Sequence, residues 1–192
     1  MRRLVLVRHS QPEIVPGVPA SGWHLSDTGR DRCRALAERL AAYDLAAVVA
    51  SREPKAVETG QIVARALGTP FETAADLHEH ERPNVGLLAD EEQFQARVAS
   101  VFEHPGKLVF GRETGDEAHR RFAAALANVI ERHPHGNLAI VAHGTVMTLF
   151  VARAAGLEPV PFWKRLGLPA FVVLSLPGFD LVEVVESVGR ET

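Results

Sequence analysis

Short apolar runs that alternate with helical patterns are the feature that most constrains the fold of this chain. Residues 4–7, 45–50 and 138–142 are continuous apolar runs whose length is typical of strands buried on both faces. A helical pattern comes after each of them, and further strands are predicted at 170–176 and 181–186. Strands that alternate with helices predict an α/β fold of three layers, in which helices cover both faces of a mostly parallel central sheet.

Turn and cap residues indicate where the helices begin and end. The prolines and glycines of residues 11–24 favour a loop that could cover a site. Ser51 is expected to cap a helix that ends at Gly68, because a short hydroxyl side chain satisfies free amides at a helix start and glycine favours a helix end. Thr114 and Glu117 have the spacing of a capping box and predict that an amphipathic helix begins there.

Length and apolar content bound the number of domains. The chain has 192 residues, of which 46% are hydrophobic, enough to bury one sizeable core but few for two. We therefore expect a single domain over residues 1–192. Residues 76–112 have a less regular pattern, with one helix expected around 91–102, and we interpret this segment as a variable insertion on the main fold.

Charge, cysteine content and hydropathy exclude several kinds of partner. The formal net charge of -3 gives no global positive field for nucleic acid or an anionic membrane, so any anion site must be local. The single Cys33 cannot form an internal disulfide, which fits a reducing cytoplasm. The apolar start is too short for a secretory signal, and the longest later apolar stretch is interrupted by Arg153 before it reaches the roughly 20 residues of a membrane span. We expect a cytoplasmic protein that binds neither nucleic acid nor membranes.

Two histidines share an unusual local setting. His9 and His143 each follow directly after a predicted buried strand, and each precedes a small residue, Ser10 or Gly144. Ligands of open α/β sheets bind outside the carboxyl ends of the strands, so both imidazoles converge on one site if the strands are parallel neighbours. The small residues would let the backbone approach a ligand closely. Two core histidines satisfied by backbone partners are the alternative interpretation.

Arg8 strengthens the interpretation as an anion site. A permanently charged guanidinium directly after four apolar residues is costly to bury unless it meets an anion, and a phosphate bound by two parallel hydrogen bonds would satisfy it. A structural ion pair with an Asp or Glu remains the alternative.

Six motifs occur in order along the chain, from residue 4 to about 155, or about four fifths of its length: LVLVRHS, LSDTG, SREPKAVETGQIVARALG, LHE, ETGDEAHRRF and IVAHGTVM. This ordered set resembles the histidine phosphatase superfamily, which includes the cofactor-dependent phosphoglycerate mutases. The resemblance implies a phosphoglycerate mutase-like fold in which His9 attacks phosphorus, Arg8 and His143 hold the phosphoryl oxygens, and a Glu protonates the leaving oxygen. This scheme requires no metal and no organic cofactor.

These roles also make chemical sense from the side chains themselves. An imidazole with a pKa near 6.5 offers a neutral nucleophilic nitrogen at physiological pH, and a covalent intermediate divides one difficult displacement into two easier ones. Cationic donors such as Arg8, with the start of a helix at Gly144, then stabilise charge on the equatorial phosphoryl oxygens.

The second phosphate-binding cation is Lys55 or Arg52. The family has an Arg near the start of its second helix, and Lys55 occupies the matching position here. Lysine keeps the charge but loses the planar fork of donors, so the neighbouring Arg52 could take over the role.

The general acid is Glu79 or Glu81. Glu79 stands at the family's Leu-x-Glu position, and Glu81 is the alternative because the residues that follow depart from the pattern of relatives. We expect the acid to have a raised pKa, which keeps a carboxyl protonated near neutral pH. Glu113, before the capping box, either braces an active-site cation or favours the start of the helix.

Other polar residues give weaker signals. The pairs His78 with His80 and His133 with His135 lack a third ligand, so we expect no metal site. Residues in the insertion that could contact the non-phosphate part of a substrate are Arg82, Asn84, His104 and Arg112.

The sequence therefore predicts a metal-independent phosphomonoesterase that acts on a small phosphorylated molecule through a phosphohistidine at His9. A phosphoglycerate mutase-type phosphotransferase is one alternative, although the mutases of this family are generally longer. A weakly active module that binds a phosphate ligand or a phosphoprotein is another. Neither the substrate nor the oligomeric state can be predicted from the sequence.

Overall fold

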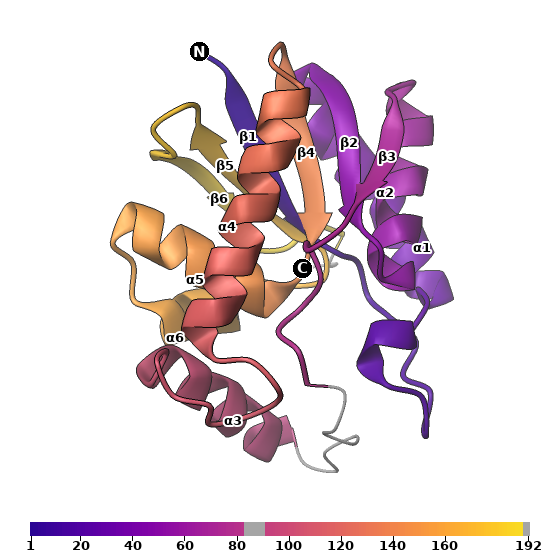
Figure 1. The fold of residues 1–192 in the computed structure, drawn as a ribbon. Helices are drawn as coiled ribbons and strands as arrows, with labels where there is room; N and C mark the ends of the chain where they lie inside the picture. The colour runs from indigo at the N-terminus through magenta and orange to yellow at the C-terminus, as the bar shows by residue number, and fades with distance from the viewer. Residues whose placement is uncertain (83–90, 190–192) are drawn as a thin grey trace.

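A computed structural model describes residues 1–82 and 91–189. In this part of the chain, six strands form one sheet in the order β3-β2-β4-β1-β5-β6, flanked by six α-helices (Figure 1). The strands are β1 (Arg3–Arg8), β2 (Leu45–Ser51), β3 (Phe71–Ala74), β4 (Asn137–Ala142), β5 (Ala170–Ser175) and β6 (Leu181–Val185). The helices are α1 (Asp27–Leu40), α2 (Pro54–Leu67), α3 (Glu91–Glu103), α4 (Gly115–Arg132), α5 (Gly144–Ala155) and α6 (Pro159–Arg165), with short 3-10 turns at Ala20–Gly22 and Ala41–Tyr43.

The sheet is parallel from β3 to β1 and antiparallel beyond β1. The pairs β2 with β3, β2 with β4 and β1 with β4 are parallel, whereas β5 runs antiparallel to both β1 and β6. The carboxyl ends of the parallel strands therefore meet at one end of the sheet, which points toward the bottom of Figure 1. This arrangement confirms the predicted α/β fold with a mostly parallel sheet.

Two apolar clusters lie on opposite faces of the sheet, because successive side chains of a strand point to opposite sides. In β1, Leu4 and Leu6 pack on the face covered by α4 and α5, in a cluster that α3 and α6 also join, whereas Val5 and Val7 pack on the face covered by α1 and α2. All four side chains are fully buried. The helices on both faces complete the three predicted layers.

The start of α2 differs from the prediction. Ser51 is the last residue of β2 rather than a helix cap, and α2 begins at Pro54 with Glu53 in the cap position. The rigid ring of Pro54 is well suited to a first helical turn, where its missing N–H has no partner to lose. The predicted helix end at Gly68 is confirmed, as is the capping box of Thr114 and Glu117.

The segment interpreted as an insertion contributes to the same core where it is described. The α3 side chains Val98 and Val101 are buried in the cluster that contains α4 and α5, and Phe102 and Phe94 contact the Trp163 ring of α6. Helix α3 therefore extends the layer of α4, α5 and α6. Within the described ranges, no helix has the length and hydropathy needed to cross a membrane.

Candidate active site

His9 and His143 lie side by side at the carboxyl ends of β1 and β4. The strands are paired up to Arg8 and Ala142, and the His9 amide donates to the Ala142 carbonyl at 3.0 Å. The two ring centroids are 5.1 Å apart with 61° between the ring planes. His9 is 7% exposed and His143 is fully buried. The convergence predicted from their matching sequence contexts is therefore present.

The ring of His9 is oriented by its own neighbour. Its Nδ1 lies 2.7 Å from the Ser10 carbonyl oxygen, which can only accept, so Nδ1 carries the hydrogen and Nε2 of the neutral ring keeps a free lone pair. Burial, together with the charges of His143 and Lys55, holds the pKa of His9 well below its usual value of 6.5. A neutral imidazole with an available Nε2 is the form that can act as a nucleophile.

His143 presents an unused nitrogen. Its Nε2 lies 2.9 Å from Ser51 Oγ, whereas its Nδ1 is buried without a hydrogen-bond partner among the described residues. Burial and the positive charge of Lys55 hold the pKa of His143 well below its usual value. A buried nitrogen that lacks a partner is costly, and a bound ligand is one way to satisfy it.

Arg8, like His143, has a buried nitrogen without a hydrogen-bond partner among the described residues. One terminal nitrogen donates to the Leu166 carbonyl, and its Nε has no partner among the residues that the structure describes. Burial lowers the pKa of Arg8 to about 10, so the guanidinium stays charged at neutral pH. A Cβ at Gly144 would lie 2.9 Å from this Nε, and only glycine therefore leaves room for the guanidinium against the start of α5.

The two candidate second cations occupy different environments. Lys55 is 5% exposed, and its Nζ donates to the Ala20 carbonyl at 2.7 Å and to the Glu53 carboxylate. Arg52 is exposed. Because an ammonium has three donors, Lys55 retains one for a further acceptor. The geometry therefore favours Lys55 over Arg52 as the second cation. Through Ala20, Lys55 also contacts the loop of residues 11–24, which was predicted to cover a site.

Glu53 connects several groups of the site, a role that its place between Ser51 and Lys55 did not predict. One carboxylate oxygen pairs with Lys55, and the other accepts the Glu79 amide at 3.0 Å and lies 3.6 Å from His143 Nε2. Glu53 thereby links the second cation, the second histidine and the segment that carries the candidate acid.

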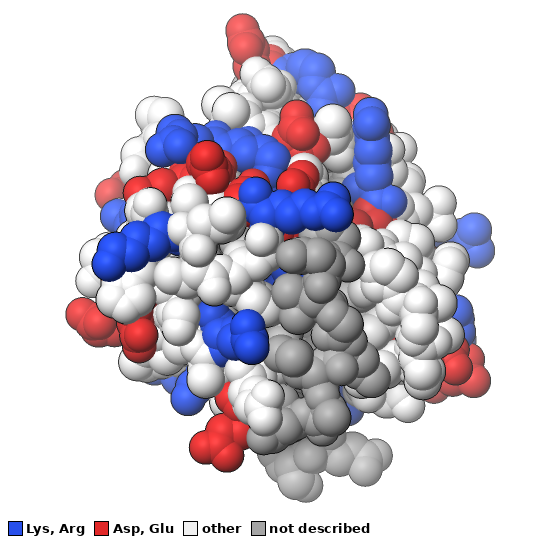
Figure 2. Space-filling model, turned by 60° about the horizontal axis from the view of Figure 1, so that its bottom comes forward, with Lys and Arg blue, Asp and Glu red and all other residues white. Residues whose placement is uncertain are grey.

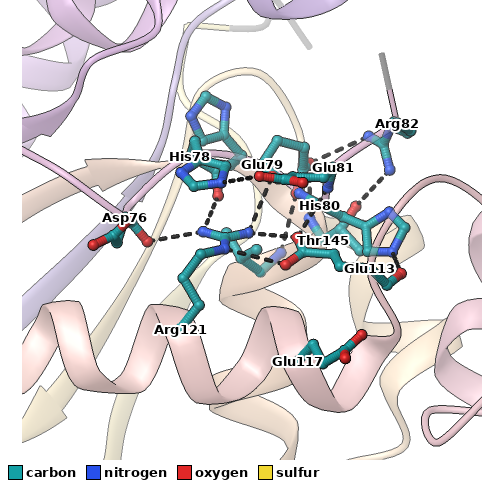
Figure 3. Close-up of polar contacts among 12 residues, drawn as sticks. Asp76, His78, Glu79, His80, Glu81, Arg82, Glu113, Glu117, Arg121 and Thr145 are labelled. Atoms are coloured by element: carbon teal, nitrogen blue, oxygen red, sulfur yellow. Dashed lines mark hydrogen bonds and ion pairs between the residues drawn. The ribbon is translucent and has the colours of Figure 1, made fainter. Parts of the chain in front are cut away.

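Glu79 reaches the start of α5 (Figure 3). Its two carboxylate oxygens accept the amides of Thr145 at 3.1 Å and Val146 at 3.2 Å, and one of them also accepts the His80 amide. Burial alone would raise the pKa of Glu79, but the charges of Arg82 and His143 and the backbone donors outweigh it and hold this pKa well below the usual range. The expectation of a raised pKa is therefore wrong for the site without a phosphate.

Of the two residues that follow the candidate acid Glu79 and His80, Glu81 lies outside the site and Arg82 belongs to it. Glu81 is exposed and pairs with His78 at 3.3 Å, so it does not join Glu79 in the site. Arg82 does join it: its guanidinium lies 3.4 Å from Glu79 Oε2 and 3.3 Å from Thr145 Oγ1, over the rings of Phe94 and Phe110. The sequence singled out Arg82 only as one of several polar residues in the insertion.

Comparison with known proteins decides the family. The family model described as histidine phosphatase superfamily (branch 1) matches residues 4–176. The chain belongs to this superfamily. Among curated proteins, no sequence match reaches significance.

Solved structures of similar fold include several phosphatases. A structure described as mycobacterial hydrolase 2 has a TM-score of 0.77 at 21% identity, with 100% of this chain and 93% of that chain covered. Mycobacterial glucosyl-3-phosphoglycerate phosphatase has a TM-score of 0.77 at 22% identity, with 97% and 99% covered. The α-ribazole phosphatase of Shigella flexneri has a TM-score of 0.73 at 20% identity, with 99% and 100% covered. At these identities the similarity establishes the fold.

The remaining polar residues that the sequence analysis named lie away from the two histidines or make other contacts. His78 pairs with Glu81, and His133 pairs with Glu72 at 3.1 Å. His80 binds the Glu113 carbonyl through Nε2 at 2.8 Å. His104, Arg112 and His135 are exposed, and Asn84 lies outside the described residues. Within residues 1–82 and 91–189, no group of three or more His, Cys, Asp or Glu has the arrangement of a metal site.

Figure 2 shows the face of the molecule at the carboxyl ends of the strands. Basic and acidic residues are interspersed over this face rather than separated into patches of one sign. The cations beside the two histidines, half-buried Arg8 and buried Lys55, are therefore not part of a basic surface patch.

Proposed function

We propose that this histidine phosphatase is a phosphomonoesterase that forms a phosphohistidine at His9 Nε2 and hydrolyses it. The observation that carries the proposal is the orientation of His9: its Nδ1 hydrogen is held by Ser10, and its free Nε2 lies in a site with Arg8, His143 and Glu79. A nucleophile must be unprotonated and held in place before it can attack phosphorus, and both conditions are met here.

Polar groups at the site that lack partners support phosphate binding. Arg8 Nε and His143 Nδ1 are buried without partners among the described residues, and Lys55 retains one donor. Gly144 is the first residue of α5, where the helix dipole favours an anion. A bound phosphate dianion would raise the pKa of His143 and favour its protonated form as a donor. These groups would stabilise charge on the phosphoryl oxygens during transfer.

The first step transfers the phosphoryl group to the enzyme. His9 Nε2 forms a bond to phosphorus as the bond from phosphorus to the leaving oxygen breaks, and Glu79 gives its proton to that oxygen. In the site without phosphate, Glu79 is ionised because Arg82 and the amides of α5 favour its charged form. A phosphate dianion beside it reverses this balance by adding negative charge, and thereby raises the pKa of the acid when it is needed.

The second step returns the enzyme to its starting state. Glu79, now a carboxylate, accepts a proton from a water molecule whose oxygen attacks phosphorus, and the bond between phosphorus and His9 Nε2 breaks. The net reaction converts a phosphate monoester and water into an alcohol and inorganic phosphate. His9 regains its lone pair and Glu79 its proton.

Small phosphorylated metabolites are the substrates to test first. Two proteins of similar fold are described as acting on glucosyl-3-phosphoglycerate and as an α-ribazole phosphatase. Another structure of the former holds inorganic phosphate. Their names supply the first members of a substrate panel, to be screened with chelator present, since no step above needs a metal.

Replacement of the nucleophile tests the proposal. We expect His9→Ala to lower the hydrolysis of an aryl phosphate at least about 1,000-fold, because the covalent route is lost. His135→Ala, which changes an exposed histidine at the opposite end of β4, should retain full activity. A quenched reaction of the wild type should hold acid-labile phosphate on the protein, and that of His9→Ala should not.

Other results of the same experiment would overturn the proposal. Transfer of the phosphoryl group to a second hydroxyl without release of inorganic phosphate would indicate a mutase-type phosphotransferase. Phosphate binding without hydrolysis or transfer across the panel would indicate a binding module. Full activity in His9→Ala would exclude His9 as the nucleophile.

A further inference from the structure

Glu79 lies on a segment that has no helix or strand of its own. Residues 75–82 connect the end of β3 to the part of the chain outside the description, and none of them belongs to a regular element. A general acid must nevertheless be held to within a fraction of an ångström of its working position. Groups on neighbouring elements must therefore fix the backbone of this segment.

Arg121 of α4 binds the backbone of the candidate acid and of the residues just before it (Figure 3). Its Nη1 donates to the Asp76 carbonyl at 2.8 Å and to the His78 carbonyl at 3.0 Å, and its Nη2 donates to the Glu79 carbonyl at 3.2 Å. The planar guanidinium suits this task, because it presents several donors in a fixed geometry. One side chain thus holds three main-chain carbonyls of the segment.

Glu113 fixes Arg121 in turn. Its carboxylate accepts Arg121 Nη2 at 2.6 Å and Nε at 3.2 Å, a two-pronged ion pair with both side chains mostly buried. The same carboxylate accepts the Glu81 amide at 2.9 Å, and the Glu113 carbonyl accepts His80 Nε2. Glu113 directly precedes the Thr114 cap and Arg121 lies within α4, so both members of the ion pair are positioned by the first turns of this helix.

We infer that Arg121, held by Glu113, is a positioning residue that aims Glu79 at the leaving oxygen of the substrate. The inference rests on the proposed function, in which Glu79 is the general acid. The contacts of Arg121 are all to backbone carbonyls and to Glu113, and it therefore acts through Glu79 rather than on the substrate. Without Arg121, the segment would lose three hydrogen bonds that hold its backbone, whereas Arg8, His9 and His143 would keep their contacts.

The dependence of the rate on the leaving group separates this role from a general effect on folding. The value of kcat/KM covers the steps up to the phosphoenzyme, and general acid catalysis matters most when the leaving oxygen is strongly basic. A series of aryl phosphates with phenols of increasing pKa therefore gives a slope that reports on the acid. A partly unfolded preparation lowers every kcat/KM by the same factor and leaves the slope unchanged.

The experiment compares Glu79→Gln, Arg121→Gln, Arg121→Lys and the matched control Arg120→Gln, which alters the exposed neighbour on α4. For the least acidic phenol we expect losses of about 100-fold in Glu79→Gln and about 10-fold in Arg121→Gln, with less than about 3-fold for the most acidic phenol. Arg121→Lys should give an intermediate slope, because its ammonium has fewer and less fixed donors. Arg120→Gln should match the wild type.

Each outcome bears on a different claim. A steep slope in both Glu79→Gln and Arg121→Gln supports the inference. A steep slope in Glu79→Gln with wild-type slopes in both Arg121 variants overturns it and leaves the proposed function intact. A wild-type slope in Glu79→Gln removes Glu79 as the acid, and the proposed mechanism fails with it. If Arg121→Gln does not fold, the slope of Arg121→Lys decides between these outcomes.

Discussion

His9 is kept neutral by its surroundings, and this has a consequence for the pH dependence of the reaction. Burial and the nearby charges of His143 and Lys55 lower its pKa well below 6.5, so a fall in pH through 6.5 does not protonate it. We expect kcat/KM for an aryl phosphate, corrected for the second ionisation of the substrate near pH 6, to show no loss with an apparent pKa of about 6.5. A pH-rate profile checks this. An acidic limb centred near pH 6.5 would show that His9 titrates normally.

Single residues also show how far the sequence predicts the site. His9, His143 and Arg8 were found because each stands at the end of a continuous apolar run, where a polar side chain needs a reason to be buried. Glu53 and Arg121 were missed as members of the site, since a charged residue near a helix start and one on an amphipathic helix are equally typical of solvated surfaces. Their roles depend on backbone groups far away in sequence, to which they are brought by the fold.

At the scale of elements, the loop that precedes α4 packs closely against the segment of Glu79. Gly111 has a φ of +84°, and a Cβ there would lie 2.3 Å from the Glu81 carbonyl oxygen. The Arg112 amide donates to the same carbonyl at 2.6 Å. An alanine at 111 would therefore have to move the backbone next to Glu79, in addition to bearing the cost of a left-handed conformation.

The variants Gly111→Ala and Gly68→Ala separate the cost of the steric contact with Glu81 from the cost of the left-handed backbone conformation. Gly68 also has a positive φ, of +64°, but a Cβ there would meet nothing within 4 Å. We expect urea unfolding to show a loss of about 1 kcal/mol for Gly68→Ala, with full activity, because only the backbone conformation is strained. Gly111→Ala should lose about 2–4 kcal/mol and should steepen the leaving-group dependence of kcat/KM. Equal losses in both variants would show that the contact with Glu81 is easily relieved.

Two elements could not be predicted because their sequences resemble loops. Helix α6 has seven residues with prolines at 159 and 161, and it is fixed by the burial of Phe162 and Trp163 in the core rather than by its own pattern. Strand β3 has only four residues, and it is held by pairing with β2. The longer strands and helices were predicted because their apolar periods repeat often enough to be distinctive.

For the whole molecule, periodicity predicted the layers of the fold but not every strand direction. β5 is buried throughout, as a strand of a parallel sheet would be, and yet it runs antiparallel to β1. A continuous apolar run reports burial on both faces and carries no information on direction. The two antiparallel strands lie beyond β1, so the edge where β1 and β4 present their histidines is unaffected.

The buried histidines also couple the stability of the whole molecule to pH. His9, His80 and His143 have folded-state pKa values below 6.5, each chiefly because of burial. Above about pH 6.5 these rings are neutral in both the folded and the unfolded state, and their contribution to stability is fully present. Below this pH the unfolded chain binds protons there and the folded protein does not, so the free energy of unfolding falls by up to about 1.4 kcal/mol per pH unit for each ring.

His80 allows this coupling to be measured away from the nucleophile. Urea unfolding from about pH 7.5 to about pH 5.5 should show a nearly constant free energy of unfolding above pH 6.5 and a decline below it. His80→Gln keeps an N–H near the position of Nε2 and removes one titrating ring, so the decline should be shallower by up to about 1.4 kcal/mol per pH unit. His135→Ala, which removes an exposed ring, is the matched control for the loss of a histidine. If His80→Gln declines as steeply as the wild type, the buried ring of His80 does not contribute, and the acid sensitivity belongs to the other histidines with a lowered pKa, His9, His119 and His143.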